Sequence, residues 1–529
     1  MQADRGFTLS HQKVALELGF SGVLAGFTEL TIVPSNAALR HIYLHARCMD
    51  IQRVLCNGQE VRFEHTDAVQ SLALSDIHGH AQLKRDLFSA TSQGAEGELR
   101  ISLPDHLRPE RVSSGTEGNA DGEEFSMMTI RIDYVLEDVH EAIQVIQPTA
   151  DAPYRVPHMY TRPLGLNSSR CWVPCLDSLW DRCTWELEYV VPRRLSVDMG
   201  DLDDETPEIY VISSGELTEH AMHPQNPEKS VFYYTQQVAT SVQHVAFCAG
   251  PFVMTRLSPA GLQTCETLSF CLPEHEHELR STTQFAWQAI EYISSEYGSY
   301  PFGSFKLVFV DGTHEDCHTA STLAICSSDL LHPPSVIDQA FENRHILSHA
   351  VAFQWVGINI IQKTWADTWL IHGLSQYLAS MFLRWLLGNN EYRFRMKKDC
   401  DRLCHWDIGM PPLYQAGRDE PLDPQLLSFV NLKAPLVLYL LDRRLCKMGA
   451  SLGLGRVIPK VFLQAITGEM SNNALGTHSF LRTCKKVSSA DLRLFMDQWI
   501  NGSGCPRFIC TATFNRKKLL IEMHVHQES

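Results

Sequence analysis

The 529-residue sequence contains no run of eighteen apolar residues, the length that a membrane-spanning helix requires. Its first residues, MQADRGFTLSHQ, lack the basic region and the apolar core of a secretory signal. These two absences predict a protein of the cytosol or nucleus. The composition is otherwise that of an ordinary globular chain, with 44% hydrophobic and 20% charged residues.

Basic residues are also scarce. The 45 Lys and Arg residues against 61 Asp and Glu residues give a net charge of −16. A uniformly acidic protein is repelled by nucleic acid, because contacts with phosphate need cations. Much of the acid, however, lies in two loop-like segments, 115–124 and 199–208. The net charge therefore argues only weakly against DNA binding and leaves room for a local basic face.

Two local basic runs are the candidates for such a face. Arg393 and Lys397 lie in EYRFRMKK, and Arg516, Lys517 and Lys518 follow one another near the end of the sequence. No helix-turn-helix, zinc-finger or RNP motif appears, so we expect DNA contacts to go to backbone phosphates and to weaken with salt. For each run the alternative interpretation is a solvated helix or strand face.

The sixteen cysteines are scattered and form no disulfide framework. In a chain of this length they are typical of reduced thiols. Two pairs have C-x₃-C spacing, Cys171 with Cys175 and Cys400 with Cys404, and His405 follows the second pair. Neither has a second pair at a zinc-ribbon distance, so we interpret them as structural thiols rather than metal ligands.

Hydrophobic periodicity divides the chain into a β-rich first half and a largely helical second half. The segments 127–136 and 184–192 alternate apolar and polar residues, the pattern of half-buried strands. After about residue 250 the period changes: 282–298 has helical spacing, and 343–500 is mostly helical. Residues 507–529 are β-like again. Two strands do not make a stable sheet alone, so we predict the opening of a third domain, truncated or docked on the second.

Residues 314–318 spell HEDCH, a match to H-E-x-x-H. In that motif two histidines on one helical face share a zinc ion, and the glutamate activates its water. Here the motif follows a short apolar strand, 305–310, and the next two residues, Asp and Gly, do not favour a helix. We therefore predict a polar loop. A surface metal site formed by His314, Cys317 and His318 is the alternative, based on ligand chemistry alone.

A second stretch, 346–380, resembles the active-site helices of the gluzincin aminopeptidases. The pattern of that family runs roughly HELAHQWFG and then WW-D-WLNEGFASY. FQWVG (353–357) and TWADTWLIHGLSQY (364–377) fit this frame. His349 takes the place of the first zinc ligand, and His372, 23 positions later (372 − 349), takes the place of the glutamate ligand.

The resemblance keeps the frame of the family but not its chemistry. It places Ala350 at the general-base glutamate, Phe353 at the second ligand and Asn431 at the transition-state tyrosine. A catalytic zinc needs three protein ligands, and no carboxylate remains here to take a proton from water. We interpret Phe353 as a core residue, and His349 and His372 as a hydrogen-bonded pair of partly buried imidazoles rather than a metal site. We expect no catalytic residue, no metal and no cofactor.

Flanking segments resemble one zinc-less branch of this superfamily, the TBP-associated factors that form the second subunit of the general transcription factor TFIID. The likeness runs from near residue 8 to near residue 526. It rests mainly on NSSRCWVPCLDSLWDRCTWELEYVVP (167–192), SSDLLHPPSVID (327–338), GNNEYRFRMKKDCDRL (388–403) and ATFNRKKLLIEMHV (512–525).

This resemblance implies a multidomain α+β fold. Residues 1–253 would form an N-terminal β-rich saddle domain. Residues 254–503 would form a thermolysin-like, mostly helical pseudo-aminopeptidase domain with a degenerate zinc site. Residues 504–529 would begin a truncated third β domain.

The same resemblance implies a nuclear scaffold without enzyme activity. Its partners would be other TFIID subunits, namely the largest subunit and a histone-fold subunit, and core-promoter DNA near the initiator, with no membrane. Two alternatives stay open. One is an active or residual zinc metallopeptidase that uses HEDCH or an unusual His349/His372 metal site. The other is a module that binds peptides in the former substrate groove without cutting them.

Overall fold

The computed structural model describes residues 5–70, 72, 79–93, 96–110, 125–137, 139–162, 167–195, 207–259, 265–447 and 453–528. The chain forms two compact units, the first with residues 1–294 and 299–359, the second with 295–298 and 360–529. The acidic segments 115–124 and 199–208 lie outside the described residues, except for residues 207 and 208. The domain boundaries at 253 and 503 stay a prediction, since these units group residues by compactness alone.

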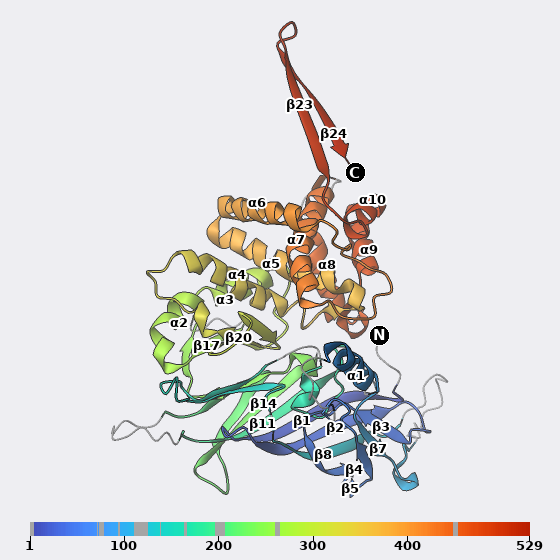
Figure 1. The fold of residues 1–529 in the computed structure, drawn as a ribbon, viewed down its shortest axis with the longest axis vertical. Coiled ribbons are helices and arrows are strands. Elements are labelled where there is room, and N and C mark those ends of the chain that lie inside the picture. The colour runs from blue at the N-terminus through green and yellow to red at the C-terminus, as the bar shows by residue number, and fades with distance from the viewer. Residues whose placement is uncertain are drawn as a thin grey trace. The chain divides into compact units, whose positions relative to one another are not determined.

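The first unit contains an eight-stranded sheet, blue to green in Figure 1. All its neighbouring strands are antiparallel except β1 and β11, which are parallel. The alternation predicted in 127–136 and 184–192 is confirmed, because every second residue of β8 and β11 is buried. In spatial order the strands are β13 (Glu216–Met222), β14 (Lys229–Ser241), β11 (Arg182–Pro192), β1 (Phe7–Leu18), β2 (Leu24–Pro34), β8 (Met128–Leu136), β4 (Asp50–Cys56) and β5 (Gln59–Glu60).

A four-stranded sheet of the first unit is buried on both faces. Its successive side chains alternate between two apolar cores, as strand geometry requires. Met159 and Val211 join a core with the eight-stranded sheet. Their neighbours Tyr160 and Ile212 join a second core with residues of a five-stranded sheet in the same unit. The strands are, in spatial order, β12 (Tyr210–Ser213), β15 (Phe247–Gly250), β10 (His158–Thr161) and β9 (Ile143–Ile146).

Two further sheets complete the strands of this unit. The first core also includes residues of a three-stranded sheet, β3 (His41–Leu44), β7 (Leu99–Ser102) and β6 (Phe63–His65). The second core includes residues of a five-stranded sheet, in the order β16 (Val253–Arg256), β17 (Glu266–Cys271), β18 (Ser304–Val310), β20 (Leu323–Ser327) and β19 (Cys317–Ala320). The apolar strand predicted at 305–310 is confirmed, since every residue of β18 is buried.

Helices of the first unit begin with α1 (His80–Gln93) and continue with α2 (Glu276–Thr283) after β17. The helix predicted over 282–298 corresponds to α3 (Ala286–Glu296), whose last two residues fall in the second unit, with a break between it and α2. Gly298, the predicted stop, has a φ of +149°, which only glycine adopts readily. α4 (Asp338–Phe353) begins the helical part of the chain.

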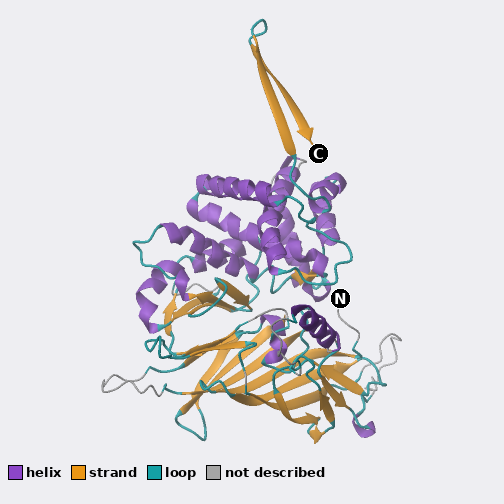
Figure 2. Cartoon of the chain, viewed as in Figure 1, coloured by secondary structure: helices purple, strands orange, loops and turns teal. Residues whose placement is uncertain are grey.

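The second unit is mostly helical, as Figure 2 shows in purple, and this confirms the pattern predicted over 343–500. Its helices are α5 (Thr368–Leu387), α6 (Asn389–Trp406), α7 (Pro424–Lys447), α8 (Leu454–Ile466), α9 (Thr477–Ser488) and α10 (Arg493–Phe495), with short parallel strands β21 (Ile361–Gln362) and β22 (Ala474–Leu475). By length and composition alone, α7 is apolar enough to cross a membrane. Its buried residues, such as Phe429 and Leu438, are those of a core helix packed on α5.

The β-like ending of the sequence is confirmed as an antiparallel hairpin, β23 (Arg507–Asn515) and β24 (Leu520–Glu528), drawn in red in Figure 1. Nearly all of its residues are exposed. The strand register places most of its apolar side chains on one face of the hairpin, since side chains alternate along each strand, whereas Ile509 and Leu520 lie on the other face. The first face contains Phe508, Cys510, Ala512, Phe514, Ile521, Met523 and Val525.

Candidate functional site

The first unit holds the first half of the aminopeptidase-like frame, on the last turns of α4. His349 and Phe353 lie one turn apart, and their rings meet edge to face with centroids 5.7 Å apart. Ala350 is almost completely buried. A Cβ at Gly357 would lie 2.5 Å from the ring of Phe353, so the ring packs directly on the Gly357 backbone. Phe353 itself is only partly buried, so the structure supports a ring that fills space beside Gly357 but not the prediction of a fully buried core residue.

Gln354 and Trp355 fix the end of α4 within the first unit. The buried amide of Gln354 accepts a hydrogen bond from Thr322 N (2.9 Å) and donates one to Ala320 O (2.9 Å). Ala320 ends β19, and Thr322 lies in the turn between β19 and β20. Trp355 is buried, and its indole nitrogen donates to Ser299 O at 3.1 Å. The FQWVG match therefore keeps its structural residues while the metal-ligand position holds a phenyl ring.

The second unit holds the other half, on α5 and α7. His372 Nδ1 lies 3.1 Å from Asn431 Oδ1, so the imidazole donates to the amide oxygen. The resemblance predicts that these two residues replace a glutamate ligand and a tyrosine of the aminopeptidase pattern, and here they bond to each other. Burial lowers the pKa of His372 to about 4, and the bond to Asn431 opposes this only in part. His372 is therefore a neutral imidazole with its Nδ1 proton engaged.

A close helix crossing makes this contact possible. A Cβ on Gly373 would lie 2.9 Å from the Ala434 side chain, so glycine allows α5 to approach α7. Trp369, one turn before Gly373, also anchors α5, because its indole nitrogen donates to Thr477 Oγ1 at 3.0 Å. The pairing of His349 with His372 stays a prediction, because the two residues belong to different units.

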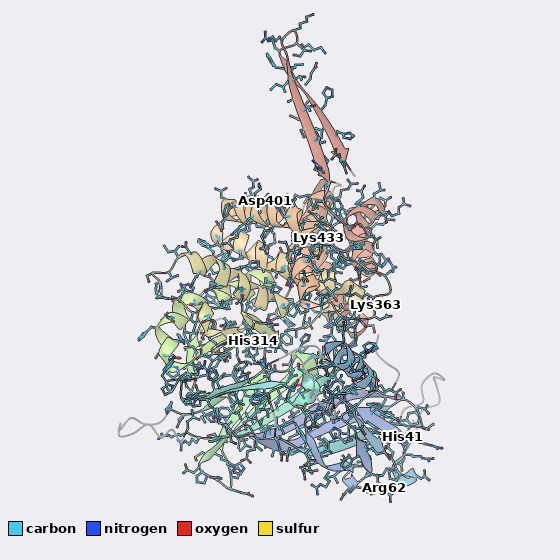
Figure 3. The ribbon with its side chains drawn as sticks, viewed as in Figure 1. His41, Arg62, His314, Lys363, Asp401 and Lys433 are labelled. Atoms are coloured by element: carbon cyan, nitrogen blue, oxygen red, sulfur yellow. The ribbon has the colours of Figure 1, made fainter. Side chains whose placement is uncertain are left out.

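The HEDCH segment is not helical, so the prediction of a loop is confirmed for its first three residues. Cys317 and His318 begin strand β19 instead. His314, labelled in Figure 3, and His318 line a cavity of about 120 Å³ in the first unit. The other lining residues are Tyr160, Thr161, Arg162, Thr313, Glu315 and Ile325. Burial lowers the pKa of His318 to about 4, so this imidazole is neutral near pH 7.

The strand geometry separates the three residues of the alternative metal site. Cys317 and His318 are neighbours on β19 and point to opposite faces of the strand. His318 lines the cavity, whereas Cys317 Sγ lies 3.3 Å from Cys326 Sγ. Within the described ranges, one group of three His, Cys, Asp or Glu side chains brings its ligand atoms within 4.8 Å of one another, namely Glu274, His275 and Asp311.

The basic residues proposed for DNA contacts lie on two surfaces of the second unit. Arg393 and Lys397 are on α6, where Lys397 pairs with Asp401 (2.5 Å) one turn away. Arg516, Lys517 and Lys518 form the exposed turn between β23 and β24. The backbone N–H groups of Lys517 and Lys518 both donate to Asn515 Oδ1. The hairpin turn therefore presents three adjacent cations, while α6 alternates cations with acids.

Curated relatives match almost the whole chain. It is 35% identical to TFIID subunit 2 of Schizosaccharomyces pombe over 98% of the chain and 47% of that protein. It is 29% identical to TFIID subunit 2 of Drosophila melanogaster over 99% of the chain and 44% of that protein. This chain is a homologue of TFIID subunit 2. It spans about half the length of the curated relatives it matches. No protein-family profile matches the chain.

Solved structures similar to this TFIID subunit 2 homologue are peptidases. Yeast LTA4 hydrolase in complex with bestatin has a TM-score of 0.69 and 15% sequence identity, covering 96% of the chain and 70% of the hydrolase. The M1 zinc metallopeptidase from Deinococcus radiodurans has a TM-score of 0.64 and 17% identity, covering 95% of each chain. The chain therefore has an M1 aminopeptidase-like fold. At these identities the likeness concerns the fold and not the activity.

Sequence reasoning did not identify the cavity or the thiol pair at β19. The residues Tyr160 and Arg162 reach the cavity from β10 and its end, about 150 positions before His314 in the sequence. No local motif signals that approach. The Cys317–Cys326 pairing had a weak signal, since the two cysteines flank eight residues with a Ser-Thr pair near their centre that suits a turn.

Proposed function

We propose that this chain is a non-catalytic scaffold subunit of the general transcription factor TFIID, acting in the nucleus at RNA polymerase II promoters. What carries the proposal is homology to TFIID subunit 2 over 98% of the chain. The residues on the aminopeptidase-like frame support the same conclusion. Because the relatives are about twice as long, the complete functions of those proteins extend to this chain only as part of this proposal.

The chemistry of the frame supports a protein without peptidase activity. Hydrolysis by this fold would need three zinc ligands and a carboxylate that takes the proton of the bound water. At the corresponding positions the chain offers a phenyl ring in contact with Gly357, a buried methyl group at Ala350 and a histidine whose Nδ1 is bonded to Asn431. His349 and His372 remain, and together they make at most two of the three protein ligands that a catalytic zinc ion needs.

The test of this part measures metal and hydrolysis together. The purified chain is equilibrated with zinc, desalted and analysed for bound metal, and it is assayed with aminoacyl amides. The D. radiodurans metallopeptidase, measured in parallel, is the positive control. We expect less than one zinc per ten chains and no turnover above the buffer blank. One equivalent of zinc that is lost in a His349→Ala variant, or turnover that a chelator abolishes, would establish the metallopeptidase alternative instead.

The proposed partners are the largest TFIID subunit and a histone-fold subunit. An M1-type fold offers them a wide, rigid surface of sheets and helices. The test is affinity capture from nuclear extract with the full chain as bait, followed by mass spectrometry. We expect these two subunits to be enriched over a heat-denatured sample of the same bait. Equal recovery on both baits would argue against the scaffold role.

Promoter DNA is a further proposed partner, bound through backbone phosphates. The hairpin turn is the better candidate, because Lys397 on α6 pairs with Asp401 at 2.5 Å, whereas Lys518 at the turn forms a looser pair with Glu522 at 3.5 Å. We expect replacement of Arg516, Lys517 and Lys518 by Gln to lower the salt dependence of binding, since each phosphate contact contributes about one unit of slope in a plot of log K against log salt. Replacing the exposed Lys84 on α1 by Gln removes one positive charge and is the control for each of the three single replacements.

The hairpin is also the proposed start of a third β domain over residues 504–529, after domains over 1–253 and 254–503. Its exposed apolar face supports this, because two strands rarely hold together alone. Hydrogen exchange tests the idea. We expect the hairpin amides of the 529-residue chain to exchange within seconds and those of the corresponding segment in the longer S. pombe relative to be protected. Equal exchange in both proteins would contradict it.

A peptide-binding module without hydrolysis is the second candidate. The observation in its favour is the cavity that Arg162, His314 and Glu315 line, because it offers a cation and an acid close to apolar residues. Equilibrium dialysis with free peptides distinguishes the two candidates. Saturable peptide binding that an Arg162→Gln variant loses, together with no capture of TFIID subunits, would favour the peptide-binding module.

A further inference from the structure

Two cysteines face each other across the turn that joins β19 and β20. Cys317 and Cys326 are direct partners in the antiparallel ladder, and their Sγ atoms lie 3.3 Å apart. The neighbouring pair, Asp316 and Ser327, is joined by the backbone bond from Ser327 N to Asp316 O at 2.9 Å. Antiparallel ladders alternate hydrogen-bonded and non-hydrogen-bonded pairs, so the two cysteines occupy a non-hydrogen-bonded position.

That position suits a disulfide bond without any backbone movement. Directly opposed residues of a non-hydrogen-bonded pair have Cα atoms about 4.5 Å apart. Disulfides bridge Cα separations of about 4.4 to 6.8 Å. The two sulfur atoms are already in contact, and rotation about the Cα–Cβ bonds is enough to bring them within bonding distance. The turn of Ser321 and Thr322 between the strands holds this register.

The surroundings give the two thiols different reactivity. Cys317 is half-buried on β19, the edge strand of the five-stranded sheet, so that a small oxidant has access to it. Cys326 is buried, and burial raises its pKa well above the usual value for a thiol. Because the thiolate is the reactive form, the accessible Cys317 reacts first and Cys326 acts as the resolving thiol.

We propose that Cys317 and Cys326 are a reversible oxidative modification site, a dithiol that hydrogen peroxide converts to a cross-strand disulfide. Sulfur of Cys317 attacks one oxygen of the peroxide, and the O–O bond breaks. Cys317 becomes a sulfenic acid, and the departing hydroxide takes the Cys317 proton and leaves as water. Sulfur of Cys326 then attacks that sulfur, the S–O bond breaks, and a second water carries away the Cys326 proton. Two thiols lose two protons and two electrons, and with these one peroxide becomes two waters.

The disulfide would hold the edge strand β19 to β20 beside the cavity. His318 lies next to Cys317 on β19, and the loop before it carries His314 and Glu315, which line the same cavity. Oxidation would therefore restrict the movement of one wall of that cavity. The inference depends on the β19–β20 geometry and is independent of the transcription role proposed above.

Peptide mapping of the full chain tests the proposal directly. Trypsin cuts after Lys306 and Arg344, and the peptide between them contains Cys317 and Cys326 but no other cysteine and no methionine or tryptophan. The folded chain is treated with peroxide, its remaining thiols are alkylated under denaturing conditions, and the peptide is weighed. We expect it to lose both alkyl groups and two hydrogens together, and to regain both alkyl groups after dithiothreitol.

Variants assign the roles of the two thiols. In Cys317→Ser the peptide should keep its alkyl group at Cys326 after peroxide. In Cys326→Ala the sulfenic acid at Cys317 should persist and be trapped by dimedone, which should not label the wild-type chain there. Cys400→Ser, which removes an exposed thiol on α6, should leave the disulfide yield unchanged. The proposal is overturned if both cysteines stay alkylated at a peroxide concentration that oxidises Cys400, or if each forms its own sulfinic acid without a disulfide.

Discussion

The neutral state of His372 predicts a loss of stability in mild acid. The pKa of this histidine is about 4 in the folded chain, against an ordinary value of 6.5. Above pH 6.5 the side chain is neutral in both the folded and unfolded states, so its contribution is fully present. As the pH falls from 6.5 toward 4, the unfolded state binds a proton at His372 and the folded state does not, so the free energy of unfolding decreases over this window.

The size of the effect follows from the two pKa values. Between pH 7 and pH 5 the linkage relation gives a loss of about 2 kcal/mol for one such histidine. His372 is half-buried, so solvent screening makes this an upper value. The variant His372→Asn removes the titration, while its amide N–H can still reach Asn431 in the manner of Nδ1.

The assay is urea unfolding of the wild-type chain and His372→Asn at pH 7 and pH 5. We expect the wild type to lose about 1–2 kcal/mol more than the variant between the two pH values. The exposed His277, changed to Asn, is the control and should behave as the wild type does. Equal losses in wild type and His372→Asn would refute the reasoning. A chelator should not alter stability at pH 7; a decrease would mean that His372 binds a metal ion.

Two further predictions concern buried contacts. Lys433, labelled in Figure 3, and Asp407 form an ion pair (2.6 Å) whose side chains are 2% and 0% exposed. Lys433→Met should destabilise the chain by about 3–5 kcal/mol, because it leaves a buried carboxylate without its partner. The double variant with Asp407→Leu should recover most of that loss in urea unfolding. Gly357→Ala should cost roughly 2–4 kcal/mol, because its φ is +141° and the new methyl group would lie 2.5 Å from the Phe353 ring. Adding Phe353→Ala should relieve the clash but not the backbone strain, so the double variant should be less destabilised than the sum of the two single changes, as measured by thermal unfolding.

The strands and helices that local periodicity in the sequence predicted are mostly present in the structure. The alternation in β8 and β11, the apolar strand β18 and the helices after α4 follow directly from which residues must face the core. The aminopeptidase-like frame around His349 and His372 stays a prediction, although both residues do lie on helices, α4 and α5. Homology to TFIID subunit 2 agreed with motifs spread over almost the whole chain.

Tertiary structure decided what depends on contacts between distant segments. No sequence pattern predicted that His372 on α5 would bond to Asn431 on α7. That contact depends on the close packing of the two helices, which Gly373 allows. The polar pattern of residues 93–125 predicts a loop, which is wrong for strand β7 inside that stretch, and the helix α1 just before it was not predicted. The meeting of Cys317 with Cys326 and the cavity beside His318 likewise depend on ladder register and sheet packing. The sequence determines which residues are buried or share a helical face, whereas strand register and packing determine which of them are in contact.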